Sequence, residues 1–158
     1  MKENEEGHRG RGSIRAVHHH YGWSATYFVT IQAKKREPLF DSPELRAILT
    51  DTWHSLPSRF PGLGLDAFVI MPDHIHFIIE VRFNSHVAIS LGRIIGAYKS
   101  LVSHQWLTHV AARDTTGQAL PIHIWHRNYY ERVIRDEREL DTVRQYIRNN
   151  PLKLPKPS

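Results

Sequence analysis

Hydrophobic and polar residues alternate along two stretches of the chain, residues 24–33 and residues 74–81. A period of two is typical of a strand that buries one face, because successive side chains point to opposite sides. In the second stretch, the apolar face consists of Ile75, Phe77, Ile79 and Val81, and the other face of His74, His76, Ile78 and Glu80. Pro72 and Asp73 favour a tight turn before this strand. We therefore expect a hairpin with a preceding strand over residues 65–71.

Two further stretches show the spacing of amphipathic helices. The first begins with Ser42 as N-cap and Pro43 at the first helical position, and we expect Pro57 to end it. The second covers about residues 87–108. Its apolar stripe is made of Leu91, Ile94, Ile95, Tyr98, Leu101 and Val102.

The end of the chain predicts one more strand, within residues 124–135, and one more helix. Asp136 and Glu139 have the spacing of a capping box, and Pro151 stops the helix after Asn149 or Asn150. The element order is then β-α-β-β-α-β-α, whose first six elements are those of a ferredoxin-like fold. We expect an α+β domain with one antiparallel sheet and two helices on one face. The face that carries His74 and His76 would be open or covered by the last helix.

The length and composition fit one domain. We place it at residues 21–153, after a flexible basic arm at residues 1–20 and before a tail at residues 154–158. Residues 34–38 and 112–121 are expected to be loops. No run of 18 apolar residues exists, and cysteine is absent, which suits a reducing, cytoplasmic setting.

Charge points to a polyanionic partner. The chain has 21 Lys and Arg against 16 Asp and Glu, a net charge of +5. A basic balance favours nucleic acid as a partner. Many basic proteins bind no nucleic acid, so charge alone leaves this open.

The pair His74 and His76 is a candidate metal site. Two residues apart on one strand, their Cα atoms would be separated by about 6.5–7 Å and their rings would lie side by side. Imidazole suits several divalent metals. The chain has 12 His, so a chance pair bonded to its neighbours is the alternative.

A second group of candidate residues lies on the last helix. Tyr146 and Asn150 are four residues apart and project from the same face. A tyrosine oxygen can act as a nucleophile if it is activated. A metal ion nearby would help by neutralising charge in the transition state. The alternative is a tyrosine that packs at the edge of the core with its hydroxyl in water.

These motifs together resemble a known family. The segments 71–76 (MPDHIH), 133–137 (VIRDE) and 146–151 (YIRNNP) are similar to those of the REP-associated tyrosine transposases, in the single-tyrosine HUH transposase superfamily. The likeness extends to residues 27–31, 96–100 and 125–131, in the same order, and spans about residues 14–153. In this family Gln is frequent at the position of His126 and Asn at that of Asp73.

The resemblance implies a chemistry and a site. His74 and His76 would hold Mg²⁺ or Mn²⁺, with Asn150 as a polar third ligand, and Tyr146 would be the nucleophile. The partner would be single-stranded DNA, often beside a short hairpin. Attack by Tyr146 on the scissile phosphorus would leave a 5′-phosphotyrosine and a free 3′-OH, with no nucleotide cofactor. A homodimer, and the pairing of Tyr146 with the histidines of its own or another chain, stay open.

Several residues are candidates for contacts with the nucleic acid. Cations able to follow a phosphate backbone are Lys34, Lys35, Arg36, Lys99 and Arg127. Tyr129 and Tyr130 have rings that can stack on bases. For each of these residues, a solvated cation or a core aromatic is an equal alternative.

Three rival functions fit part of the pattern. One is a metal-dependent hydrolase that uses the histidine pair and Glu80, although Glu80 would lie roughly 13 Å along the strand from His76. Another is a non-catalytic RNA-binding domain, but the histidine face lacks the stacking aromatics that such a sheet carries. The last is an inactive transposase that binds DNA hairpins without cutting them.

Overall fold

A computed structural model gives the fold of residues 8–9, 23–83, 89–113 and 122–153. Within these residues the sheet has five strands in the order β1-β5-β2-β4-β3, and every neighbouring pair is antiparallel. The strands are β1 (His8–Arg9), β2 (Trp23–Ala33), β3 (Leu63–Ile70), β4 (His74–Phe83) and β5 (Trp125–Ile134). The histidine strand β4 is an interior strand, between β2 and β3.

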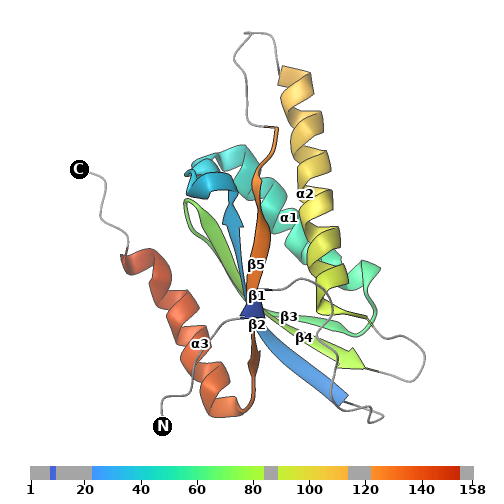
Figure 1. Ribbon diagram of the computed structural model, residues 1–158, viewed down its shortest axis with the longest axis vertical. Helices are drawn as coiled ribbons and strands as arrows, with labels where there is room; N and C mark the ends of the chain where they lie inside the picture. The colour runs from blue at the N-terminus through green and yellow to red at the C-terminus, as the bar shows by residue number, and fades with distance from the viewer. Residues whose placement is uncertain (1–7, 10–22, 84–88, 114–121, 154–158) are drawn as a thin grey trace.

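The helices form two layers on the sheet. They are α1 (Pro43–Arg59), α2 (Leu91–Arg113) and α3 (Glu137–Asn149), with short 3₁₀ turns η1 (Lys34–Arg36), η2 (Leu39–Asp41) and η3 (Asn150–Lys153). Figure 1 shows α1 and α2 on one side of the sheet and α3 on the other. The predicted ferredoxin-like α+β fold is therefore confirmed, and the last helix covers part of the histidine face.

The main core lies between the sheet and the helices α1 and α2. Its strand residues come from the apolar faces of β2 and β4, for example Val29, Ile31, Ile75 and Phe77, all buried. The hydroxyl of Tyr98 in α2 donates to the carbonyl of Leu49 in α1 at 2.9 Å. Burial of this surface fixes which way each strand faces, and hence sends His74 and His76 to the opposite side.

A smaller cluster lies between the sheet and α3. Ile78 from β4 and Ile134 from β5 pack with Val143 and Ile147 of α3. Ile78 is the apolar residue of the predicted polar face of β4. It gives α3 a place to dock two residues beyond His76.

The structure moves several predicted boundaries. Pro57 lies inside α1, which continues to Arg59, because loss of one N–H in the last turn still lets the Phe60 amide bond the Leu56 carbonyl at 3.0 Å. The second helix begins at Leu91 after the cap Ser90, whose hydroxyl accepts from the Arg93 amide, and it runs on to Arg113. The expected loop at residues 34–38 contains the 3₁₀ turn η1, in which Lys35 and Arg36 have positive φ angles.

The predicted arm and tail lie mostly outside the described residues. Of the stretch 112–121 that was expected to be a loop, residues 112–113 belong to α2, so that part of the prediction is wrong, and the rest lies outside the described residues. Within the arm, His8–Arg9 forms β1 and pairs with Glu131 and Tyr130 of β5. No helix in the described part of the chain is long and apolar enough to cross a membrane.

Candidate active site

His74 and His76 turn their rings toward a common point. The Nε2 atoms of the two rings are 3.1 Å apart, and the ring centroids are 4.6 Å apart. The hairpin sets this arrangement, since the Met71 amide donates to the His74 carbonyl at 2.8 Å and places both side chains on one face of β4. Two nitrogen atoms that converge in this way can share one ion.

The other ring nitrogens are held by two polar neighbours. Nδ1 of His74 lies 2.5 Å from a carboxylate oxygen of Asp73, and Nδ1 of His76 lies 2.8 Å from the hydroxyl of Thr30. A carboxylate only accepts, so Nδ1 of His74 carries the hydrogen, and in the neutral ring the Nε2 lone pair points to the common point. The hydroxyl of Thr30 can donate or accept, so it suits His76 with its proton on either nitrogen. Such outer partners orient metal-binding histidines.

The local electrostatics favour the neutral form of the His76 ring and the ionised form of the Asp73 carboxylate. Burial and the nearby His74 lower the pKa of His76 to about 4. Burial alone would raise the pKa of Asp73, but the hydrogen bond from His74 and the charge of Arg36 outweigh it and lower that pKa. A neutral imidazole is the form that binds a metal. His76 is only 6% exposed.

Tyr146 reaches this site from α3, seventy residues further along the chain. Its ring centroid is 5.6 Å from that of His76 and 6.1 Å from that of Phe28. Phe28 in turn stacks on His76 at 5.4 Å with an interplanar angle of 26°. Tyr146 is 43% exposed, so a large substrate can reach it. The structure thus brings Tyr146 and the histidine pair together within one chain.

Local sequence explains how α3 is placed. The Glu139 amide donates to the Asp136 carboxylate at 2.8 Å, and the Glu139 carboxylate accepts from the Arg135 amide at 3.0 Å. This capping arrangement begins the helix directly after β5. Val143 and Ile147 then dock on the sheet, and the intervening turn presents Tyr146 beside β2 and β4.

Asn150 lies one helical turn beyond Tyr146, where α3 passes into η3. Its side chain is buried, with 8% of the residue exposed, and within the described part of the chain its Nδ2 has no hydrogen-bond partner. An unpaired buried donor costs free energy, but the unpaired atom is the nitrogen and not the oxygen that would bind an ion. The ligand role of the Asn150 oxygen stays a prediction.

No cluster of three His, Cys, Asp or Glu side chains suited to a metal exists among the described residues. Among the described residues, the candidate donors from side chains are the two imidazoles and the Asn150 amide. Glu80 is turned to Arg82, with 3.4 Å between its carboxylate and the Arg82 Nε. This counts against the rival hydrolase that combines Glu80 with the histidine pair.

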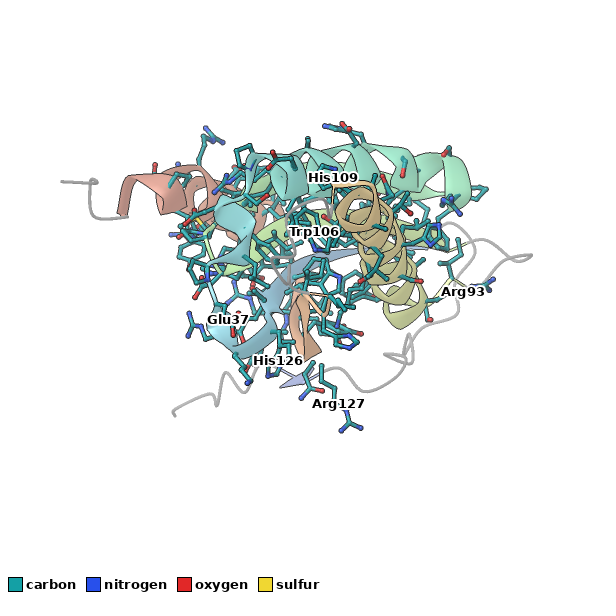
Figure 2. The ribbon with its side chains drawn as sticks, turned by 90° about the horizontal axis from the view of Figure 1, so that it is seen from above. Glu37, Arg93, Trp106, His109, His126 and Arg127 are labelled. Atoms are coloured by element: carbon teal, nitrogen blue, oxygen red, sulfur yellow. The ribbon has the colours of Figure 1, made fainter. Side chains whose placement is uncertain are left out.

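The candidate DNA-contacting cations separate into two groups. Lys34, Lys35 and Arg36 are exposed on η1, and the Arg36 Nε donates to Asp73 at 3.2 Å, so this turn lies next to His74. Arg127 is also exposed and points away from the body of the molecule (Figure 2). Lys99 is half-buried and its ammonium donates to the His126 carbonyl at 2.8 Å, which ties α2 to β5.

The two neighbouring tyrosines of β5 face opposite sides of the sheet. Tyr129 is opposite Ile31 and is 8% exposed in the main core, where burial and Glu131 raise its pKa to about 12. Tyr130 is opposite Thr30, on the face that carries the histidines, and is partly exposed. Tyr130 is thus the one of the pair whose ring can meet a base near the site.

Sequence reasoning did not assign a role to Thr30 or Phe28, although both lie on the face of the first strand opposite Val29. The alternation along this strand indicated that both side chains face away from the core. Placing them at the site also required the register of β2 with β4, which pairs Thr30 with His76 and Phe28 with Ile78.

Two solved structures share the fold. A REP-associated tyrosine transposase bound to a REP hairpin aligns with a TM-score of 0.60 at 19% identity, over 87% of this chain and 73% of that chain. A candidate transposase from Deinococcus radiodurans aligns with a TM-score of 0.55 at 20% identity, over 90% of this chain and 96% of that chain. These likenesses define the class of the protein as one with a transposase fold.

The sequence itself carries the assignment further. Residues 21–150 match the sequence model of the IS200-like transposases. The chain belongs to this family. It is also 32% identical to an uncharacterized protein of Haemophilus influenzae, over 90% of this chain and 88% of the other.

Proposed function

We propose that this protein nicks and rejoins single-stranded DNA through a covalent bond to Tyr146, with Mg²⁺ or Mn²⁺ held by His74 and His76. The family and fold support a transposase-type function. The finer assignment depends chiefly on one observation, the 5.6 Å separation between the rings of Tyr146 and His76. These residues come from different layers of the fold, so their meeting is not a product of local sequence.

The residues present fit a divalent ion. The two Nε2 atoms converge, and the Nδ1 atoms lie within hydrogen-bond distance of Asp73 and Thr30. Asn150, buried at the end of the tyrosine helix, would supply a neutral oxygen as the third ligand. Neutral ligands leave the ion its full positive charge, which would polarise the scissile phosphate and stabilise the charge that develops on it. Because carboxylates and water suit Mg²⁺ better than imidazole does, Mn²⁺ is expected to bind more tightly.

The reaction would be a transesterification. The Tyr146 oxygen attacks the phosphorus and loses its proton to solvent, while the bond from phosphorus to the 3′ oxygen breaks and that oxygen takes up a proton. The products are a 5′-phosphotyrosine and a free 3′-OH. Attack by a 3′-OH reverses these steps and releases Tyr146, so the phosphodiester energy is conserved and no nucleotide is consumed.

The proposed partner is a single strand that carries a DNA hairpin, as in the hairpin-bound transposase of the same fold. Lys34, Lys35, Arg36 and Arg127 would follow the phosphates, and Tyr130 would stack on a base beside the site. Tyr129 is buried, and the half-buried Lys99 is bonded to the His126 carbonyl, which favours structural roles for those two residues.

The test is incubation of the protein with end-labelled single-stranded DNA and Mn²⁺, followed by a denaturing gel. A covalent protein–DNA adduct is expected for the wild type and is expected to be absent in Tyr146→Phe and in His76→Ala. Tyr130→Phe is the matched control, since it removes a hydroxyl from the same sheet face but leaves the nucleophile. An adduct that persists in Tyr146→Phe and disappears in Tyr130→Phe would move the nucleophile to β5.

The rival functions give different results in the same assay. If the wild type cleaves the DNA, and neither the wild type nor any variant forms an adduct, the result would favour a hydrolase. Retention of a hairpin on a native gel, with neither cleavage nor adduct at any Mn²⁺ concentration, would favour a binding protein that has lost catalysis.

A further inference from the structure

An ion pair ties the tyrosine helix to the edge of the sheet. Arg144 of α3 donates to Asp66 of β3 through two bonds, Nε to Oδ1 at 2.9 Å and Nη2 to Oδ2 at 2.6 Å. The pair lies at the surface of the molecule, where Asp66 is exposed and Arg144 is half-buried. A two-point Arg–carboxylate contact fixes direction as well as distance, which a single bond from a lysine cannot do.

The edge strand is deformed where it supplies this carboxylate. The register of β3 with β4 shifts between Leu65 and Phe68, so Asp66 and Ala67 lie at an irregularity in the strand. Bulges of this kind re-aim a side chain and locally twist the strand. Here the side chain so placed is the partner of Arg144.

Arg144 and Tyr146 lie on opposite flanks of α3. Two residues correspond to about 200° around a helix, since one turn takes 3.6 residues. Between the two flanks, Val143 and Ile147 face the small cluster on the sheet. Arg144 therefore reaches outward to β3, and Tyr146 reaches inward to Phe28 and His76.

Apolar contacts oppose a rotation of α3 about its long axis less specifically than a directional bond does, because contacts between aliphatic side chains are not directional. The cluster under α3 has four buried members, with Phe28, Ala67, Val69 and Leu140 packed against them. A small roll of α3 would keep Val143 and Ile147 on the sheet but would carry Tyr146 away from His76. The bond from Arg144 to Asp66, on the far flank, opposes this motion.

We propose that Asp66 and Arg144 form a positioning clamp, which sets the rotation of α3 and thereby holds Tyr146 beside His76 of its own chain. The bonds described for Asp66 and Arg144 join them to each other and to Asp141, and none joins them to the histidine pair, so we assign them a positioning role. The effect of the clamp on the rate of DNA cleavage rests on the proposed function, whereas its effect on the position of Tyr146 does not.

A matched control exists in the same helix. Asp141 also accepts from Arg144, at 3.3 Å, but it lies three residues earlier in α3. Its carboxylate cannot tie the helix to the sheet. Asp66→Asn and Asp141→Asn therefore each remove one carboxylate from Arg144, and only the first removes a link between two elements.

The geometric test is ¹⁹F NMR of protein with fluorotyrosine at position 146, without metal or DNA. The rings of Phe28 and His76 should give this fluorine a shift distinct from that of an exposed tyrosine. We expect Asp66→Asn to move the signal toward the exposed value, and Asp141→Asn to leave it unchanged. Equal melting temperatures of the two variants would show that the fold is intact.

The catalytic test is the single-turnover rate of adduct formation at saturating Mn²⁺ and DNA. We expect Asp66→Asn to slow this rate about tenfold or more, since an error of 1 Å in placement can cost roughly a hundredfold, with no change in Mn²⁺ affinity. Asp66→Glu should recover part of the rate. An unmoved ¹⁹F signal in Asp66→Asn, or equal effects of Asp66→Asn and Asp141→Asn, would overturn the clamp. If the wild type forms no adduct, the proposed function fails while the NMR comparison still decides the clamp.

Discussion

Thr30 of β2 and His76 of β4 are direct cross-strand partners, and the hydroxyl of Thr30 lies 2.8 Å from Nδ1 of His76. The bond joins an interior strand of the sheet to the histidine that packs against Tyr146. Because the hydroxyl can either donate or accept, it can follow His76 when the proton moves from Nε2 to Nδ1. That change is required when Nε2 binds an ion.

We predict that Thr30→Val weakens the binding of Mn²⁺ about tenfold, because loss of an outer partner of a metal ligand typically costs 10–100-fold. Valine keeps the shape and the β propensity of threonine, so the fold should be retained. The measurement is the free Mn²⁺ signal in an electron paramagnetic resonance titration. The control is Thr26→Val on the same face of β2, where Glu80 is the cross-strand partner. Equal affinities of the two variants would contradict the assigned role.

Substitutions at Asp73 should give a graded result. Asp73→Asn keeps an oxygen that accepts from Nδ1 of His74, so we expect a loss of Mn²⁺ affinity of only a few-fold. Asp73→Ala removes the acceptor and should cost roughly tenfold or more. The same titration measures both. An Asn variant as weak as the Ala variant would mean that the negative charge, rather than the orientation of the ring, sets the affinity.

Local patterns predicted the parts of the site that lie within single elements. Alternation along residues 74–81 placed His74 and His76 on one face, and the capping box at Asp136 and Glu139 located the start of the tyrosine helix. Strand alternation and helix capping both depend on residues close together in the chain, so they can be predicted from the sequence. Pro57 misled the prediction of the α1 end because a missing N–H near a helix terminus costs little.

The contacts that complete the site are long-range and need the register of the sheet. Thr30 and His76 are 46 residues apart, and Asp66 and Arg144 are 78 apart. In β5 a buried charge, Glu131, occupies a core-facing position, so alternation could not tell the face of Tyr129 from that of Tyr130. The register with β2 was required to separate these two rings.

We predict opposite consequences of removing those two rings. Tyr129→Ala should lower the free energy of unfolding by about 3 kcal/mol, as for other large aromatic truncations in a core. Tyr130→Ala should change stability little but weaken the binding of a single-stranded DNA by about 1–3 kcal/mol if the ring stacks on a base. Urea unfolding and fluorescence anisotropy with a labelled strand measure the two effects. Weaker DNA binding by a stable Tyr129→Ala variant would reverse the assignment of faces.

The last prediction contrasts Lys99 with Arg127. Lys99→Met leaves the His126 carbonyl without its donor, so we expect a loss of about 1.5–3 kcal/mol in the free energy of unfolding. Its affinity for DNA should be that of the wild type, because the ammonium of the half-buried Lys99 is already bonded to the His126 carbonyl. Arg127→Ala should leave stability unchanged and weaken DNA binding. The slope of log K against log salt should fall by about 0.7, because the variant neutralises one phosphate fewer on a single strand. A salt slope that falls in Lys99→Met, but not in Arg127→Ala, would place the DNA path over α2 instead of over the exposed end of β5.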